Sequence, residues 1–316
     1  MIRAFVFPGQ GSQAVGMGKA LAEAFPAAKH VFEEVDDALN QKLSKLMFEG
    51  PEADLTLTEN AQPALMAVSQ AVLRVLETEG KWTLPAKARF VAGHSLGEYS
   101  ALAAAGTLSL QDTARLLKLR GQAMQKAVPV GIGAMAALLG LDLPAAQEIA
   151  AAAAKETGLV CSAANDNAPG QVVVSGHKEA VDRAIAIAAE KGAKRSVLLP
   201  VSAPFHCALM QPAADAMAEA LGNTTLNVPA VPVIANVTAA PVSEPDQIRK
   251  LLVEQVTATV RWRESIETMK KEGVTRIFEI GAGKVLSGLV KRIDREIEGS
   301  AVGTPEDIEA ALKALS

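Results

Sequence analysis

Short apolar runs alternate along the chain with longer segments in which apolar residues recur at helical spacing. Apolar runs bounded by turn residues are typical of buried strands, and the segments between them favour amphipathic helices. This alternation predicts an α/β fold with a parallel sheet. The strands expected in this sheet are residues 2–7, 88–93, 231–237 and 277–280, and the helices include 101–105, 109–126, 207–221, 248–255, 264–271 and 305–315.

The pattern changes between residues 129 and 200, where strands and helices follow in the order βαββαβ. This order is typical of a ferredoxin-like unit. We expect 129–200 to be an inserted domain that forms one wall of a cleft, with 1–128 and 201–316 forming the main domain. Within the insert, residues 165–170 are expected to form a turn; its polar groups could contact substrate, but we favour a solvated turn. The insert strands expected are 134–139, 159–163, 171–175 and 195–199, and its helices are 145–155 and 178–190.

Residues 93–97, Gly-His-Ser-Leu-Gly, lie between a predicted strand and a predicted helix. A G-x-S-x-G sequence at such a junction predicts a nucleophile elbow, a turn so tight that its flanking positions need glycine. The following helix would direct free N–H groups and a partial positive charge toward Ser95. Ser95 is therefore the candidate nucleophile, and the N–H of Leu96 is a candidate oxyanion donor. The alternative is a glycine-flanked turn with an unreactive serine.

Arg120 occupies an unusual position in the helix predicted over 109–126. At about 100° per residue it lies between Leu116 and Met124 on the apolar face, away from the other charged residues. A buried guanidinium costs several kcal/mol unless an anion meets it. One interpretation is a structural ion pair with a distant Asp or Glu. The other is a site that holds the free carboxylate of a substrate in two hydrogen bonds.

His206, in a proline-containing loop before a predicted helix, is the best candidate for the general base of Ser95. Cys207 is a rival nucleophile, but it lacks an elbow. A Ser-His-Asp hydrolase needs an acid at a strand end between serine and histidine in the sequence. Asp166 lies in this interval but belongs to the insert. His206 is therefore expected to be oriented by a neutral group, such as a backbone carbonyl, or by an acid that the sequence does not identify.

The glycine-rich loop after the first strand allows three interpretations. Residues 9–14 match the G-x-G-x-x-A pattern of dinucleotide sites, but no strand with an acidic end follows about 20 residues later. We favour a loop that brings a backbone N–H, that of Gln10, to the edge of the sheet as a second oxyanion donor. A simple strand-to-helix connection is the third interpretation.

Composition and charge narrow the class of protein. The chain has 316 residues, 49% hydrophobic and 21% charged, as in ordinary soluble globular proteins. A net charge of −4 argues against a general nucleic-acid binder. The two cysteines, Cys161 and Cys207, offer neither a disulfide framework nor metal-ligand spacing and suggest a reducing compartment. The first residues hold too short an apolar run for a signal peptide, and no stretch is apolar enough to cross a membrane. We expect a cytoplasmic protein.

Several segments, in order along essentially the whole chain, resemble the malonyl-CoA:acyl carrier protein transacylase family. The serine elbow with its preceding histidine and the downstream Arg-Gly pair is far more specific than any single motif. The segments are Phe-Pro-Gly-Gln-Gly-Ser-Gln (7–13), Gln-Pro-Ala-Leu (62–65), Gly-His-Ser-Leu-Gly-Glu-Tyr-Ser-Ala-Leu (93–102), Arg-Gly (120–121), Pro-Gly-Gln-Val-Val-Val-Ser-Gly-His (169–177), His-Cys-Ala-Leu-Met (206–210) and Glu-Ile-Gly-Ala-Gly-Lys-Val-Leu (279–286).

This resemblance implies an α/β-hydrolase-like domain with a ferredoxin-like insert. It implies that Ser95 is acylated, that His206 is its base and that Arg120 binds the malonyl carboxylate. It also implies roles for other residues, which rest only on their positions matching those of the family. The resemblance implies an oxyanion hole from the N–H groups of Gln10 and Leu96, a carbonyl of Gln255 that orients His206, and pocket positions for Gln62 and Asn236.

The activity implied is ping-pong transfer of malonyl from CoA to the phosphopantetheine thiol of acyl carrier protein, in fatty-acid or polyketide synthesis. The partners expected are this carrier and a CoA thioester, with no nucleic acid, no membrane, no metal and no redox cofactor, and the protein is expected to be a monomer. The basic residues Lys284, Lys291 and Arg292 near the C-terminus are a candidate surface for the acidic carrier. A serine hydrolase, or a non-catalytic module that binds CoA or acyl carrier, remains as an alternative.

Overall fold

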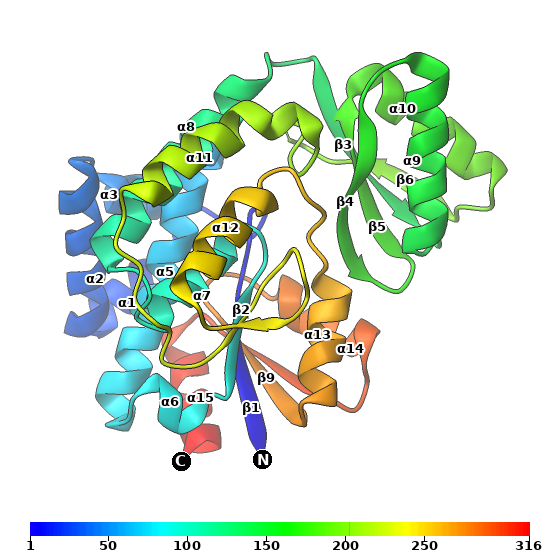
Figure 1. Cartoon of the computed structure of the whole chain (residues 1–316). Helices are drawn as coiled ribbons and strands as arrows, with labels where there is room; N and C mark the ends of the chain where they lie inside the picture. The colour runs from blue at the N-terminus through cyan, green and yellow to red at the C-terminus, as the bar shows by residue number, and fades with distance from the viewer. Residues whose placement is uncertain (202) are drawn as a thin grey trace.

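The computed structural model describes residues 1–201 and 203–316 and contains two separate sheets (Figure 1). The larger sheet has the strand order β10-β9-β1-β2-β7-β8. Its strands pair in parallel except for the short β7–β8 hairpin at one edge. The strands are β1 (Ile2–Phe7), β2 (Phe90–Gly93), β7 (Val233–Ile234), β8 (Pro241–Val242), β9 (Val274–Ile280) and β10 (Glu298–Val302).

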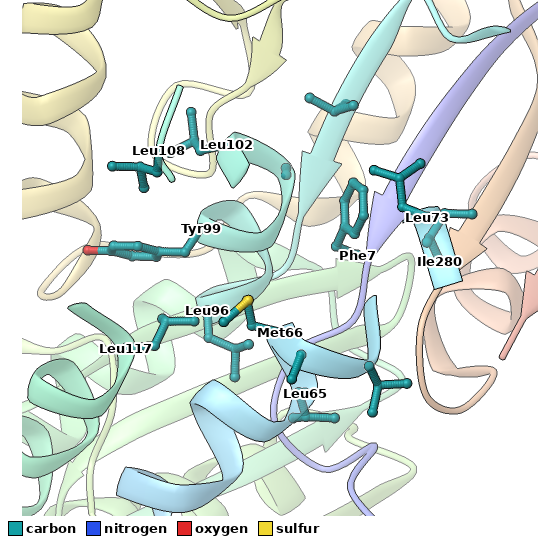
Figure 2. Packing of buried hydrophobic residues seen from close by; sticks show 14 of the residues in the cluster. Phe7, Leu65, Met66, Leu73, Leu96, Tyr99, Leu102, Leu108, Leu117 and Ile280 are labelled. Atoms are coloured by element: carbon teal, nitrogen blue, oxygen red, sulfur yellow. The ribbon is translucent and has the colours of Figure 1, made fainter. Parts of the chain in front are cut away.

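Strand β1 lies in the middle of this sheet, and its side chains alternate between the two faces. Phe5 and Phe7 pack into one hydrophobic cluster, whereas Ala4 and Val6 pack into another on the opposite face. Successive side chains of a strand point to opposite faces, so a strand covered on both sides is apolar at every position. Figure 2 shows Phe7 among residues of the first cluster, including Leu65, Leu96 and Tyr99.

Helices cover both faces of the sheet. The first cluster is built from a large set of helices around α5, whose 23 residues are mostly buried. The second is built from α13 and α14. The helices of this part of the chain are α1 (Lys19–Ala24), α2 (Pro26–Leu39), α3 (Leu43–Glu49), α4 (Glu52–Thr56), α5 (Thr58–Gly80), α6 (Leu84–Lys87), α7 (Leu96–Ala104), α8 (Leu110–Ala127), the 3-10 helix Ala208–Met210, α11 (Gln211–Gly222), α12 (Pro245–Gln255), α13 (Trp262–Lys271), α14 (Val285–Ile293) and α15 (Pro305–Leu315).

The second sheet comes from the middle of the chain, drawn in green in Figure 1. Its order is β4-β5-β3-β6 with every neighbouring pair antiparallel, the arrangement of a ferredoxin-like unit. Helices α9 and α10 cover one face of this sheet. The opposite face packs against Val201 and Phe205, which follow β6 in the chain. The elements are β3 (Gly133–Leu139), α9 (Leu143–Thr157), β4 (Cys161–Ala168), β5 (Gln171–His177), α10 (Lys178–Glu190) and β6 (Arg195–Leu198).

The α/β class with a parallel-rich sheet and a separate antiparallel sheet is confirmed. The strands of the two sheets fall on either side of the predicted boundaries at 128/129 and 200/201, and the domain division itself stays a prediction. No helix of the described residues is long and apolar enough to span a membrane.

Two strand predictions need correction, and the edge strands β8 and β10 were not predicted. Residues 165–168 belong to β4 rather than to a turn, because the strand continues through two register shifts before turning at 169–170. The strand expected over 231–237 is only two residues long in β7. Strand β10 was not predicted because Glu298–Val302 contains no apolar run, and its place at the sheet edge does not require one.

Candidate active site

Ser95 lies at the sharp turn between β2 and α7. Its backbone has φ 53° and ψ −110°, a left-handed conformation that costs free energy for a residue with a side chain. The turn leaves no room for side chains at its flanks. A Cβ on Gly93 would lie 1.8 Å from the carbonyl oxygen of Gly97, and one on Gly97 would lie 2.3 Å from that of Phe7. The two glycines therefore allow the elbow to form and to pack against β1.

The Oγ of Ser95 lies 2.8 Å from Nε2 of His206. The other ring nitrogen of His206, Nδ1, lies 2.8 Å from the backbone carbonyl oxygen of Gln255. Because a carbonyl oxygen only accepts, Nδ1 must carry the proton, which leaves Nε2 free to accept from the serine hydroxyl. Burial, and secondly the charge of Arg120, lowers the pKa of His206 to about 3. The imidazole is therefore neutral at physiological pH and can act as a base.

The guanidinium of Arg120 is buried, with 1% of the residue exposed. Its Nη2 donates to Ser95 Oγ at 3.0 Å and to the side-chain oxygen of Gln255 at 2.8 Å, and its Nη1 donates to the side-chain oxygen of Gln62 at 2.7 Å. Throughout 1–201 and 203–316, no acidic side chain forms a direct ion pair with it, and the buried carboxylate of Glu98 acts on it across the side chain of Gln255. A structural ion pair, the alternative left open by the sequence, is therefore absent from the described residues.

These three groups open onto a cavity of about 840 Å³. Ser95, His206 and Arg120 all line it, as do Gln10 and Leu96. The insert supplies part of the wall through Met135, Asn165 and Leu199. The wall residues otherwise come from the loop after β1, from the region of α4 and α5, and from the segment after β6.

Asn236 and Gln255 lie behind the cavity wall and support it. The Oδ1 of Asn236 accepts the N–H of Ser95 at 2.8 Å, and its Nδ2 donates to the carbonyl oxygen of Gly93 at 2.7 Å. Gln255 contacts Arg120 through its side chain and His206 through its backbone. Both residues are fully buried. Asn236 thus contacts the elbow, whereas Gln255 contacts both the base and the cation.

The loop that carries Gln10 packs directly on the elbow. A Cβ on Gly9 would lie 2.7 Å from the carbonyl oxygen of His94, so only glycine allows this approach. The side-chain oxygen of Gln10 accepts from Thr58 Oγ1 at 2.9 Å, and the same hydroxyl accepts from Nε2 of Gln62 at 2.9 Å. A chain of hydrogen bonds thus joins this loop through Thr58 and Gln62 to Arg120.

Comparison with known proteins adds an independent line of support. A family profile described as acyl transferase domain matches residues 4–301. The malonyl CoA-acyl carrier protein transacylase of Bacillus subtilis strain 168 is 49% identical over 312 residues, which cover 99% of this chain and 96% of the relative. The chain belongs to the malonyl-CoA:acyl carrier protein transacylase family.

Solved structures of transacylases agree with this membership. The crystal structure of an acyl-carrier-protein S-malonyltransferase from Bartonella henselae has a TM-score of 0.96 and 61% identity, covering 100% of this chain and 99% of that one. A malonyl-transacylase in complex with a type II polyketide synthase acyl-carrier protein has a TM-score of 0.95 and 43% identity, covering 99% of this chain and 100% of that one.

The cysteine rival is not supported in this transacylase-family chain. Cys207 is fully buried and donates its Sγ–H to the carbonyl oxygen of Pro204 at 3.2 Å. Burial raises the pKa of its thiol, so the nucleophilic thiolate is disfavoured. Within the described ranges, no group of three or more histidine, cysteine or acidic side chains could hold a metal ion.

Two contacts tie the insert to the elbow and the main domain. Nε2 of His94 lies 2.8 Å from Oδ1 of Asn167. The buried carboxylate of Asp166 forms an ion pair with Arg263 of α13 at 2.9 Å. Both insert residues belong to the stretch of β4 that the sequence had placed in a solvated turn. The strand therefore brings the wall of the cavity into a fixed position beside Ser95.

Glu98 and Thr58 also belong to the site but are not among the residues predicted from the sequence. Glu98 lies in the first turn of α7 and is only 3% exposed, and Thr58 is equally buried at the start of α5. A signal was present for Glu98, since it is the one charged residue in a helix otherwise made of small and apolar residues with a single tyrosine. No comparable signal marks Thr58, because threonine is common near the start of helices.

Proposed function

We propose that this protein transfers a malonyl group from malonyl-CoA to the phosphopantetheine thiol of an acyl carrier protein, through a malonyl ester of Ser95. One observation carries the proposal. The Ser95 hydroxyl lies between a neutral base, His206 Nε2 at 2.8 Å, and a buried cation without an acidic partner, Arg120 Nη2 at 3.0 Å. A malonyl thioester carries an electrophilic carbonyl and a carboxylate one carbon apart. Its carbonyl can therefore react with Ser95 while its carboxylate binds Arg120.

In the first half-reaction, His206 Nε2 takes the proton of the Ser95 hydroxyl as Oγ attacks the thioester carbonyl carbon. The tetrahedral intermediate then collapses. Its C–S bond breaks, and the CoA sulfur leaves with the proton held by His206. In the second half-reaction, the carrier thiol gives its proton to His206 and its sulfur attacks the ester, and Oγ of Ser95 leaves with that proton. This is a ping-pong sequence, in which CoA departs before the carrier thiol reacts.

The oxyanion of each tetrahedral intermediate would accept hydrogen bonds from the N–H groups of Leu96 and Gln10. Leu96 is the first residue of α7, so its N–H has no partner within the helix. Both residues line the cavity beside Ser95. A donor of this kind stabilises the transition state by about 3–4 kcal/mol.

Arg120 would bind the malonyl carboxylate in charge-assisted hydrogen bonds, in place of one of its neutral partners Gln62 and Gln255. The arrival of this carboxylate at Arg120 would also change the pKa of His206. The positive charge of Arg120 is one cause of the low pKa of His206, and a bound carboxylate would offset that charge. A bound malonyl group would therefore make His206 a stronger base for the proton of Ser95, which an acetyl group cannot do.

The carrier would present its phosphopantetheine thiol at the mouth of the cavity. The solved complex of a related malonyl-transacylase with an acyl-carrier protein supports this partner. We propose that the enzyme works as a monomer, since Ser95, His206, Arg120 and Gln255 all come from one chain. Two free, buried cysteines fit a cytoplasmic location. The steps above use no metal and no redox cofactor.

Mass spectrometry of the protein incubated with malonyl-CoA tests this function. Without carrier, we expect the peptide containing Ser95 to gain one malonyl group, and the Ser95→Ala variant to gain none. Addition of carrier protein bearing phosphopantetheine should then move the group to the carrier. Absence of the label on Ser95 would refute the acyl-enzyme. Loss of the label to water as fast as to the thiol would indicate a hydrolase instead.

A further inference from the structure

Glu98 is a buried carboxylate that the proposed steps do not use. Its Oε1 accepts the backbone N–H of Asn236 at 3.0 Å, and its Oε2 accepts from Nε2 of Gln255 at 2.5 Å. Both oxygens therefore accept from N–H donors, the arrangement that an ionised carboxylate satisfies best. A buried carboxylate is costly even with such partners, so its place directly beneath the elbow calls for a function.

Gln255 connects this carboxylate to both reactive groups. With its Nε2 directed to Glu98, its Oε1 faces Arg120 Nη2 at 2.8 Å. The opposite amide orientation would place an oxygen against the carboxylate and an NH₂ group against the guanidinium, and both contacts would be unfavourable. Nε2 also donates to the backbone oxygen of Ser95 at 3.0 Å, so Glu98 and this carbonyl together fix the orientation of the amide. The backbone oxygen of Gln255 accepts from His206 Nδ1 at 2.8 Å, so the same residue also orients the base.

We propose that Glu98 is a positioning residue that performs, through Gln255, the task that the acid of a Ser-His-Asp triad performs by direct contact. The inference rests on the proposed function. Proton transfer from Ser95 creates an imidazolium on His206 close to the cation of Arg120. The negative charge of Glu98 offsets this repulsion without touching the substrate, and it keeps Gln255 in place while charge moves.

The groups that face Glu98 determine how it responds to pH. The positive charge of Arg120 in α8 lowers the pKa of Glu98, whereas Asn236 and Gln255, which donate hydrogen bonds to it, are neutral. His206 is neutral because its pKa is lowered to about 3. Burial raises the pKa of neighbouring Tyr99, so its phenol is also neutral. Burial likewise raises the pKa of Glu98 to about 7, against the opposing effects of its two hydrogen bonds and Arg120. The carboxylate is therefore lost as pH falls through about 7, and activity should fall with it.

Glu98→Gln is the variant that tests this role, because it keeps the size and removes the charge. A glutamine can accept from only one of the two N–H donors, since its own NH₂ group meets the other. We expect the rate of Ser95 malonylation to fall about ten- to a hundredfold, as is found for the carboxylates and carbonyls that orient metal-binding histidines without touching the metal. The KM for malonyl-CoA should change little, and the rise of kcat/KM with pH near 7 should disappear.

The chain offers a matched control in Glu279→Gln. Glu279 is also fully buried with a raised pKa, and it accepts two backbone N–H groups, from Leu286 at 3.1 Å and Ser287 at 2.8 Å. It contacts neither the elbow nor Arg120. The Glu279→Gln variant should therefore keep the malonylation rate and pH profile of the wild type. Equal losses in the two variants would mean that Glu98 only supports the fold, and would overturn the proposal.

A second measurement separates this inference from the proposed function. A fluorophosphonate probe reacts with an activated serine and needs neither malonyl-CoA nor carrier. Its reaction with Ser95 should slow in Glu98→Gln by a similar factor and lose the same pH dependence, even if malonyl were not the natural substrate. A wild-type rate and profile in Glu98→Gln would refute the positioning role. If Glu98→Gln does not fold, Glu98→Asp should retain the pH dependence at a reduced rate, and its loss there would also refute the role.

Discussion

Arg120 Nη2 donates a hydrogen bond to Ser95 Oγ across 3.0 Å, so a buried cation touches the nucleophile itself. The same guanidinium makes its other contacts to the amide oxygens of Gln62 and Gln255. These acceptors are neutral, and no carboxylate of the described residues forms an ion pair with the guanidinium. A substrate with a carboxylate next to the reacting carbonyl can therefore contact Arg120 directly, and this relationship accounts for malonyl as the proposed acyl group.

Replacement of Arg120 by alanine should weaken malonyl transfer far more than acetyl transfer. Loss of a buried, charge-assisted contact costs about 2–5 kcal/mol, which corresponds to a reduction in kcat/KM of at least about thirtyfold for malonyl-CoA. Acetyl-CoA makes no such contact and should lose only the smaller effect of the bond to Ser95. Steady-state kinetics with both thioesters measure the ratio. Equal losses for the two substrates would show that Arg120 does not bind the carboxylate.

Glu98→Gln should change the pH dependence of stability in a defined direction. The pKa of Glu98 is raised to about 7 in the folded protein from a reference value of 4.5. Its stabilising contribution is therefore complete below pH 4.5 and is lost as pH rises to about 7. The total amounts to about 3 kcal/mol, because one pKa unit corresponds to about 1.4 kcal/mol.

Urea unfolding of the wild type and of Glu98→Gln at pH 5 and at pH 8 measures this effect. The free energy of unfolding of the variant, relative to the wild type, should be higher at pH 8 than at pH 5. A difference between the two proteins that stays constant with pH would contradict a buried carboxylate with a raised pKa.

Thr58→Val should slow transfer of malonyl and acetyl groups alike. Valine keeps the shape of threonine but removes the hydroxyl that joins Gln10 to Gln62. Nε2 of buried Gln62 would keep only the weak acceptor Sδ of Met124, and the half-buried amide oxygen of Gln10 would lose the hydroxyl as a donor. An unsatisfied buried group of this kind costs about 1–3 kcal/mol. We expect a reduction in kcat of about tenfold through the loop that carries the oxyanion donor. A loss confined to malonyl-CoA would place the role of Thr58 in carboxylate binding instead.

The exposed basic residues of the α14 region should contribute to binding of the acidic carrier. Lys284 and Lys291 are exposed there. Their replacement by glutamate should raise the KM for the carrier and leave hydrolysis of malonyl-CoA unchanged, because the cavity is not altered. Lys313→Glu, an exposed lysine on α15, is the control for net charge. An unchanged KM for the carrier in the α14 variants would exclude this surface.

The local sequence was enough to predict the features that depend on near neighbours. The glycines around Ser95 predict the elbow because only glycine fits a turn in which a Cβ would meet backbone. The apolar neighbours of Arg120 predict its burial, and helical periodicity predicts the order of elements in the insert. Each of these features depends on residues that are close together in the sequence, so their positions along the chain determine their positions in the structure.

The groups that meet around Ser95 come from distant parts of the chain and could not be paired from local sequence. Glu98 and Gln255 are 157 positions apart in the chain, and their contact depends on how α7 and α12 pack on the sheet. The strand that replaces the expected turn at 165–168 is likewise fixed by its pairing with β5, together with the bridge from Asn165 to Val260. The hydrophobic pattern of the sequence indicates which residues are buried but not which residues they contact. The acid that orients the base through Gln255 could therefore not be assigned until the helices and strands were placed.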